Sequence, residues 1–180
     1  ADLPWERHYK GQLDTAVDWC ERRILTDLRQ IADDRDFSLD DIIRRIAYDE
    51  KDVQLLSAFF VSENRKSGEY LFQEGDKGES LYFVGSGTVI VVMKVPNQQE
   101  RILRKYKAGA ILGEMAIYTG ENRTASVRIE DDAKLFRLDK NQLDDMSRKF
   151  PGSTAALHTY IVRLLAERLG RANRELSRYI

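Results

Sequence analysis

The sequence is poor in the residues that metal sites and disulfides need. It contains one cysteine and two histidines among 180 residues, so an intrachain disulfide is impossible and a transition-metal site is nearly excluded. No apolar run approaches the roughly 18 residues of a membrane span, and no signal-peptide pattern opens the chain. We therefore expect a cytoplasmic protein in a reducing compartment.

An excess of charge of one sign is also missing. The net charge is −1 at pH 7 and the pI is about 6.2, so no overall field draws the protein to nucleic acid or to an anionic membrane. The chain has no phosphate-loop lysine sequence, no recognisable pair of catalytic carboxylates and no nucleophile with a histidine partner. We predict a binding protein without catalysis and without a cofactor.

The N-terminal part of the chain has a helical pattern. Apolar residues recur at steps of three and four over residues 13–31, which marks one face of a helix on which Cys20 is a buried small hydrophobe. Residues 38–41 have the spacing of a capping box, which predicts the start of a second helix. A third, short helix is expected over residues 52–60.

Short β-branched or aromatic runs separated by glycines follow. They are "GEYLFQEGD", "ESLYFVGSG", "TVIVVMKV", "RILRKYK", "TASVRI" and "AKLFRL". Turns are expected between several of them, at Pro96-Asn97 and at Asp131-Asp132. Six or more short strands at this spacing predict an antiparallel β-roll or jelly roll rather than a parallel sheet. The fold class is α+β, predominantly β.

Helix returns after the last strand. Asp139 can cap a short helix, and Pro151 is suited to open a long one. A heptad-like seam runs along the long helix: Val162, Leu165, Leu169, Ala172, Leu176 and Tyr179. This face can pack on the protein's own roll or form a homodimer, and both interpretations stay open.

These patterns divide the chain into two parts. We assign residues 1–50 to an N-terminal helical segment and residues 51–180 to a second domain. Within the second domain the β-roll covers about 61–139, and the C-terminal helices cover about 139–178.

The stretch "GEMAIYTGENRTASV", residues 113–127, interrupts the strands. Residues 114–119 are too few for a core helix and suit one helical turn, with Gly120 as its C-cap. The free backbone N–H groups that open such a turn favour an anion, and Gly113 lets a ligand approach the backbone closely. Arg123 can bind phosphate with a planar, bidentate fork.

Two more residues extend this site. Thr124 offers a hydroxyl donor to the same anion. Glu114 only accepts when it is ionised, so it needs donors such as the hydroxyls of a sugar. The stretch therefore offers donors for a phosphate and a carboxylate that accepts from a hydroxyl. This combination predicts that the ligand is a ribose phosphate.

Residues 53–177 resemble a cyclic-nucleotide-binding domain. The run "GEYLFQEGDKGESLYFVGSGTV" is similar to the opening hairpins of this family, and "GEMAIYTGENRTASV" resembles its phosphate-binding cassette. The cassette is as similar to those of cyclic-nucleotide-gated channels and cyclic-GMP-dependent kinases as to those of bacterial cyclic-AMP receptors. It departs from many members at Asn122, where they have proline.

The resemblance implies a role for each cassette residue. Arg123 would pair with the cyclic phosphate, assisted by Thr124 and the backbone N–H of Ala125, and Glu114 would accept from the ribose 2′-hydroxyl. Three more residues would line the site through main-chain groups: Gly113, Met115 and Ala116. The long C-terminal helix would close over the base as a lid, with four candidate contacts: Tyr160, Arg163, Leu164 and Arg168.

The expected function is therefore a regulatory module whose ligand is cyclic AMP or cyclic GMP. We favour cyclic AMP, although Thr124 could contact a guanine. One alternative is an interaction or dimerisation module with a degenerate pocket. Another is the cytosolic regulatory part of a larger transporter or channel, because "LDTAVDWCERRIL" (13–25) is weakly similar to the last helix of the regulatory domain of sulfate-permease-type transporters.

Two further classes are not expected. A transcription factor of the cyclic-AMP-receptor type needs roughly 60 residues of helix-turn-helix after the lid helix, and the sequence shows neither these nor a basic patch. A cupin-like metalloenzyme needs clustered histidines on its strands, and residues 61–139 contain none.

Overall fold

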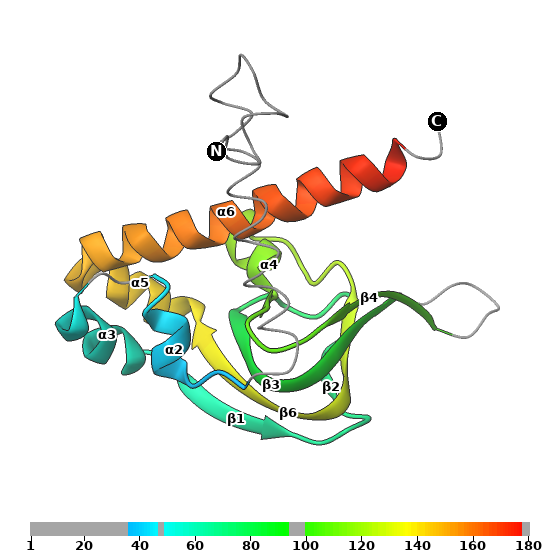
Figure 1. Ribbon diagram of the computed structural model, residues 1–180, viewed down its shortest axis with the longest axis horizontal. Coiled ribbons are helices and arrows are strands. Elements are labelled where there is room, and N and C mark those ends of the chain that lie inside the picture. The colour runs from blue at the N-terminus through cyan, green and yellow to red at the C-terminus, as the bar shows by residue number, and fades with distance from the viewer. Residues whose placement is uncertain (1–35, 47–48, 94–99, 178–180) are drawn as a thin grey trace, which may run out of the picture. The chain divides into compact units, whose positions relative to one another are not determined.

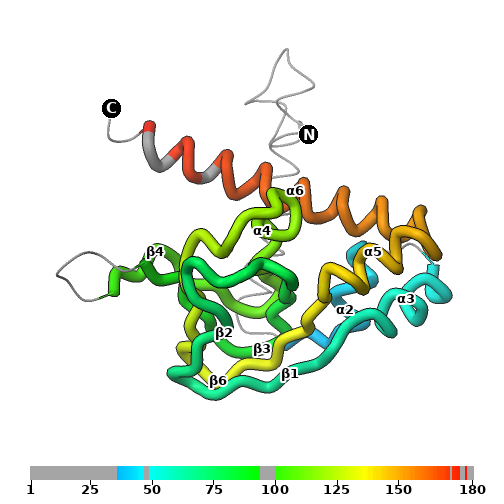
Figure 2. Tube along the Cα trace, turned by 180° about the vertical axis from the view of Figure 1, so that it is seen from behind, coloured from blue at the N-terminus to red at the C-terminus, as the bar shows by residue number. Residues whose placement is uncertain are grey.

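In the part of the chain that the structure describes, six antiparallel strands form one sheet, in which two long strands pair with the four short ones. In the computed structural model, β3 (Ser80–Met93) and β6 (Ser126–Asp139) pair along almost their whole length. The short strands are β1 (Val61–Arg65) and β2 (Tyr70–Phe72), which pair with β6, and β4 (Arg101–Tyr106) and β5 (Ile111–Leu112), which pair with β3. The strands wrap into a roll (Figures 1 and 2), so the predicted antiparallel β-roll is confirmed.

The structure describes residues 36–46, 49–93 and 100–177. The unit that contains them begins at Asp36. Some predictions lie outside the described residues: the helix over 13–31 with Cys20, the transporter-like stretch within it, the turn at Pro96-Asn97, and the last side chains of the seam.

Two predicted breaks between strands are wrong. The single strand β3 runs without a break from Ser80 in "ESLYFVGSG" to Met93 in "TVIVVMKV", and the turn predicted at Asp131-Asp132 lies inside β6. The register between β3 and β6 instead shifts at three successive places between Val84 and Val89. Such irregularities bend a strand without ending its hydrogen-bonded ladder. At the positions where the sequence pattern predicted a break between strands, the strands therefore bend and continue, and this bending helps to form the roll.

Three helices lie together at one end of the roll, and the long helix α6 (Pro151–Leu176) runs across above it (Figure 1). The three are α2 (Leu39–Ile43), α3 (Glu50–Ser57) and α5 (Lys140–Lys149). The capping box predicted at residues 38–41 is confirmed, because the Asp41 N–H donates to Ser38 Oγ at 3.1 Å and the Ser38 N–H donates to Asp41 Oδ2 at 3.0 Å. Asp139 is the N-cap of α5, as predicted. No helix in the described part of the chain is long and apolar enough to cross a membrane.

Two apolar clusters make up the core. One fills the inside of the roll and includes Val84, Val89, Ile129 and Leu135. The other joins the helices to the roll and includes Ile42, Phe83, Met146, Leu157 and Ile161. Although α2 precedes the boundary predicted between residues 50 and 51, it packs in the same cluster as α6.

Gly87→Ala tests the irregular part of β3. Gly87 has φ +80°, and a Cβ there would lie 2.2 Å from the Asp132 backbone oxygen and 2.7 Å from Ala133 Cα. We expect the free energy of unfolding, measured by urea denaturation, to fall by about 3 kcal/mol or more, from backbone strain and overpacking together. Gly68→Ala is the matched control, since φ is +89° with nothing within 4 Å, and it should cost about 1–2 kcal/mol. Equal losses would contradict the close approach of β3 and β6.

Candidate ligand-binding site

A single-turn helix between β5 and β6 forms one wall of a cavity. This helix, α4 (Glu114–Thr119), lies between Gly113 and Gly120, which have φ of 77° and 74°. The Gly120 N–H donates to the Ala116 backbone oxygen at 3.0 Å, so the predicted turn with Gly120 as its C-cap is confirmed. A Cβ on Gly113 would lie 2.5 Å from Arg123 Nη1. Glycine at this position therefore lets the arginine approach the backbone.

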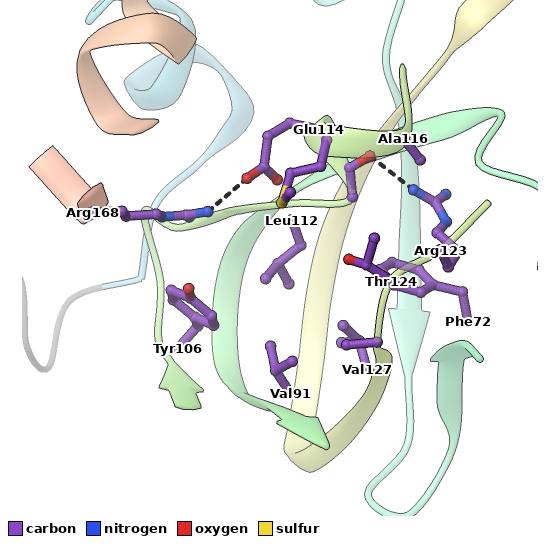
Figure 3. A pocket seen from close by; sticks show the side chains of 13 residues that line it. Phe72, Val91, Tyr106, Leu112, Glu114, Ala116, Arg123, Thr124, Val127 and Arg168 are labelled. Atoms are coloured by element: carbon purple, nitrogen blue, oxygen red, sulfur yellow. Dashed lines mark hydrogen bonds and ion pairs between the residues drawn. The ribbon is translucent and has the colours of Figure 1, made fainter. Parts of the chain in front are cut away.

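The cavity has a volume of about 150 Å³ and lies inside the roll beside α4 (Figure 3). Side chains from the strands form its apolar wall: Phe72, Val91, Tyr106, Leu112 and Val127. The cassette supplies the rest of the lining, together with Arg168 of α6: Gly113, Glu114, Met115, Ala116, Arg123, Thr124 and Ala125. The structure thus brings every cassette residue named from the sequence to one cavity.

Arg123 is buried in this cavity with neutral partners. Its residue exposure is 5%. Nη1 donates to the Gly113 backbone oxygen at 2.8 Å, and Nη2 donates to the Ser80 backbone oxygen at 2.7 Å and to Ser80 Oγ at 3.2 Å. Nε has no hydrogen-bond partner. Burial lowers the pKa of Arg123, because the charged form loses its water, yet a guanidinium stays protonated in proteins.

Glu114 is directed away from Arg123 and toward α6 (Figure 3). Its Oε1 accepts from Arg168 Nη1 at 2.7 Å, and the two side chains are 4% and 18% exposed. Arg168 also donates to the backbone oxygen of Ile111, and its Cζ lies 4.8 Å from the centroid of the Tyr106 ring. Arg168 therefore ties the long helix both to the cassette and to the wall of the roll.

The four predicted lid contacts are all in the described part of the chain, and among them only Arg168 lines the cavity. Tyr160 and Leu164 precede it by two turns and one turn of α6, and both pack against the cluster that joins the helices to the roll. The Tyr160 ring lies 6.4 Å from that of Phe83. Arg163 is exposed. Contact of these three residues with a base stays a prediction.

Sequence reasoning missed the site residues that come from distant strands. Phe72 lies under the Arg123 guanidinium, whose Cζ is 4.1 Å from the ring centroid. Ser80 accepts from Arg123, and Tyr106 lies beside Arg168. Strand periodicity can place such residues inside a roll, but it does not indicate which of them meet the cassette.

The ionisable side chains that line the cavity leave an excess of positive charge. Arg123 and Arg168 are cationic, and Glu114 is the single carboxylate in the lining. One positive charge is therefore not balanced within the lining. The described residues hold no group of three or more histidine, cysteine, aspartate or glutamate side chains that could bind a metal ion. An anion of charge −1 would balance the cavity.

Residues 63–150 match the family model of the cyclic nucleotide-binding domain. This part of the chain belongs to that family. The chain is 29% identical over 106 residues to the potassium/sodium hyperpolarization-activated cyclic nucleotide-gated channel 2 of Mus musculus, which covers 59% of this chain and 12% of the channel. It is 31% identical over 127 residues to the cyclic AMP receptor protein of Thermus thermophilus, which covers 71% of this chain and 57% of the receptor.

A solved structure confirms the fold of this family. The crystal structure of a cyclic nucleotide-binding domain from Methylobacillus flagellatus matches with a TM-score of 0.72 at 23% identity, covering 79% of this chain and 82% of that one. The chain spans little more than half of the Thermus receptor and about an eighth of the mouse channel. Both the family model and this solved structure are cyclic nucleotide-binding domains.

Arg168→Met tests the ion pair between α6 and α4. The change leaves the Glu114 carboxylate buried without its partner, so we expect the free energy of unfolding to fall by about 3 kcal/mol in urea denaturation. Arg163→Met removes an exposed arginine of the same helix and should change it by less than about 0.5 kcal/mol.

The double variant Glu114→Gln/Arg168→Met should recover most of this loss, because it no longer strands a buried charge. If the double variant lost as much free energy of unfolding as Glu114→Gln and Arg168→Met lose in sum, the pairing of Glu114 with Arg168 would be contradicted.

Proposed function

We propose that this chain is a regulatory module that binds a cyclic nucleotide without turning it over, and that cyclic AMP is its preferred ligand. The observation that carries the proposal is Arg123, a buried cation with an unpartnered Nε in a cavity that has one positive charge in excess. The family assignment of residues 63–150 supports the same ligand class.

The charge of the cavity favours a cyclic phosphate over an open one. A cyclic phosphodiester carries one negative charge at neutral pH, whereas a phosphomonoester carries nearly two because its second pKa is about 6. One charge balances the lining, and a second would lie near the Glu114 carboxylate. We propose that the phosphate accepts from Arg123 Nε–H, with Thr124 Oγ and the Ala125 N–H as further donors.

The rest of the nucleotide fits the remaining lining. Glu114 gives one oxygen to Arg168, and we propose that its other oxygen accepts from the ribose 2′-hydroxyl. Main-chain groups of Gly113, Met115 and Ala116 lie beside the sugar phosphate in this arrangement. The base packs against the apolar wall that includes Val91 and Val127.

Two observations bear on the choice of base and on regulation. The Thermus relative at 31% identity is named a cyclic AMP receptor protein, which supports cyclic AMP over cyclic GMP, while Thr124 in the lining keeps a guanine contact open. Because Arg168 belongs to α6 and contacts Glu114, a ligand held at Glu114 biases the position of this helix, which then acts as the lid.

We also propose that the module works together with a larger protein. The match to the mouse channel covers 12% of that protein, which supports a module within, or acting on, a larger effector such as a channel or transporter in the cytoplasm. In this role, a change in the position of α6 transmits ligand binding to the effector.

Arg123→Ala tests the anchor of the phosphate. Removing one partner of a buried charge pair costs roughly 2–5 kcal/mol, so the affinity for cyclic AMP in isothermal titration should fall at least about tenfold. Arg128→Ala is the matched control, because Arg128 is paired with Glu100 at 3.9 Å and does not line the cavity. A loss below about threefold for Arg123→Ala would contradict the proposed role.

The same titration separates the ligands. Cyclic AMP should bind more tightly than cyclic GMP, and more tightly than the 5′-monophosphate, whose charge does not match the cavity. Glu114→Gln should weaken binding less than Arg123→Ala, since the amide oxygen still accepts from a hydroxyl. No heat with either cyclic nucleotide from folded, nucleotide-free protein would contradict the proposed function.

A second candidate function is dimerisation through α6. Of the predicted seam, Leu165 packs against the protein's own core, whereas Val162 and Leu169, seven residues apart, are 61% and 63% exposed. Two apolar side chains at a heptad spacing on an exposed helix face favour a second copy of the same helix as partner. Dimerisation is compatible with ligand binding. A module with a degenerate pocket that binds no ligand would still be able to dimerise in this way.

Leu169→Asp tests this candidate. A charge in a helix–helix interface is costly to bury, so the variant should sediment as a monomer where the unaltered protein sediments as a dimer. Leu55→Asp, at a 42% exposed position of α3, should leave the dimer intact. A monomeric unaltered protein, or a dimer that survives Leu169→Asp, would contradict dimerisation through this face.

A further inference from the structure

We infer that Ser80 is a positioning residue that holds Arg123 through neutral oxygens, so that the charge of the arginine is kept for the ligand. The inference rests on the proposed function for the identity of the ligand. Ser80 begins β3 and lies outside the cassette, 43 residues before Arg123 in the sequence.

Ser80 contacts the guanidinium twice. Its backbone oxygen accepts from Arg123 Nη2 at 2.7 Å, and its Oγ lies 3.2 Å from the same nitrogen. The Ser80 hydroxyl donates to Tyr82 Oη at 3.0 Å, which leaves the lone pairs of Oγ for the arginine. Ser80 and Tyr82 are 8% and 7% exposed. The buried hydroxyl therefore donates to Tyr82 and accepts from Arg123.

The other close partners of the guanidinium are neutral as well. The Gly113 backbone oxygen accepts from Nη1 at 2.8 Å. The Phe72 ring lies against the plane of the guanidinium, with Cζ 4.1 Å from its centroid. An aromatic face attracts a cation without cancelling its charge. Together with Ser80, these groups fix the position and the plane of Arg123 and leave Nε without a partner.

Two carboxylates, those of Asp76 and Glu114, act electrostatically on Arg123, but neither forms an ion pair with it, and both accept from other groups. Glu114 is paired with Arg168 at 2.7 Å, and Asp76 Oδ2 accepts from the Gln73 N–H at 2.8 Å. Among the described residues, no carboxylate forms an ion pair with Arg123. A carboxylate in the position of Ser80 would neutralise the guanidinium internally and would compete with an anionic ligand. The neutral serine avoids this competition.

Ser80→Asp and Ser80→Asn test the role of neutrality. The two side chains have nearly the same size and shape and differ in charge. In isothermal titration, Ser80→Asp should bind cyclic AMP at least about tenfold more weakly than Ser80→Asn, which corresponds to the loss of one charge-assisted pairing. Equal affinities for the two variants would overturn the inference.

The ligand-free proteins supply a second readout. An internal partner for a buried cation stabilises the fold, so the Tm of Ser80→Asp should exceed that of Ser80→Asn by at least about 2 °C at neutral pH. A merely structural defect would lower both the Tm and the affinity, whereas the inference predicts opposite changes. A lower Tm for Ser80→Asp than for Ser80→Asn would overturn it.

The design separates this inference from the proposed function. If the unaltered protein binds no cyclic nucleotide, the proposed function fails, and the Tm comparison alone decides the role of Ser80. In an Arg123→Met background the difference between Ser80→Asp and Ser80→Asn should disappear or reverse, because the partner charge is gone. A stabilising difference that persists in this background would show that it does not act through Arg123 and would overturn the inference.

Discussion

A buried arginine without a carboxylate partner is the constraint on which the rest of this site depends. Burying a cation is costly unless it is paired, and Arg123 is compensated by two backbone oxygens, a hydroxyl and an aromatic ring. These partners hold the side chain and leave its charge in place. In the proposed function, an anionic ligand supplies the favourable electrostatic interaction that Arg123 loses when it is buried away from water.

The fold serves this arrangement by bringing three distant segments together. The pairing of β3 with β5, in which Tyr82 faces Leu112, places Ser80 beside Gly113 at the start of the cassette. The register shifts between β3 and β6 bend the sheet into a roll. Gly113 and Gly120 let the chain make a single helical turn across the mouth of the roll. Arg168 then connects α6 to Glu114, so the cavity proposed to bind the ligand also contacts the helix proposed to act as its lid.

Much of this could be predicted from the sequence, because the strongest signals are local. The capping box at residues 38–41, the cap at Asp139 and the turn ending at Gly120 follow from patterns within a few residues, and so do four residues of the cassette: Gly113, Glu114, Arg123 and Thr124. The other three, Met115, Ala116 and Ala125, were predicted only from the resemblance to a known family. The continuous strands β3 and β6 were not predictable in this way, because glycines and paired aspartates favour turns when they are considered alone, and only the pairing of the two strands shows that the ladder continues.

The lid contacts, and the residues that contact the Arg123 guanidinium, also depend on tertiary structure and could not be read from local sequence patterns. Tyr160, Leu164 and Arg168 share one face of α6, but where that face crosses from core to cavity is set by how the helix lies on the roll. Phe72 and Ser80 carry no local mark of their role, since any inward-facing strand residue has the same pattern.

The most direct measurement is the resonance of the Arg123 Nε–H in an NMR titration with cyclic AMP, assigned by comparison with Arg123→Lys. The account predicts that this resonance shifts as the ligand is added and saturates together with binding, because the phosphate becomes the partner that Nε lacks. Saturable binding that leaves the Arg123 Nε–H unchanged would contradict the claim that this buried charge binds the ligand.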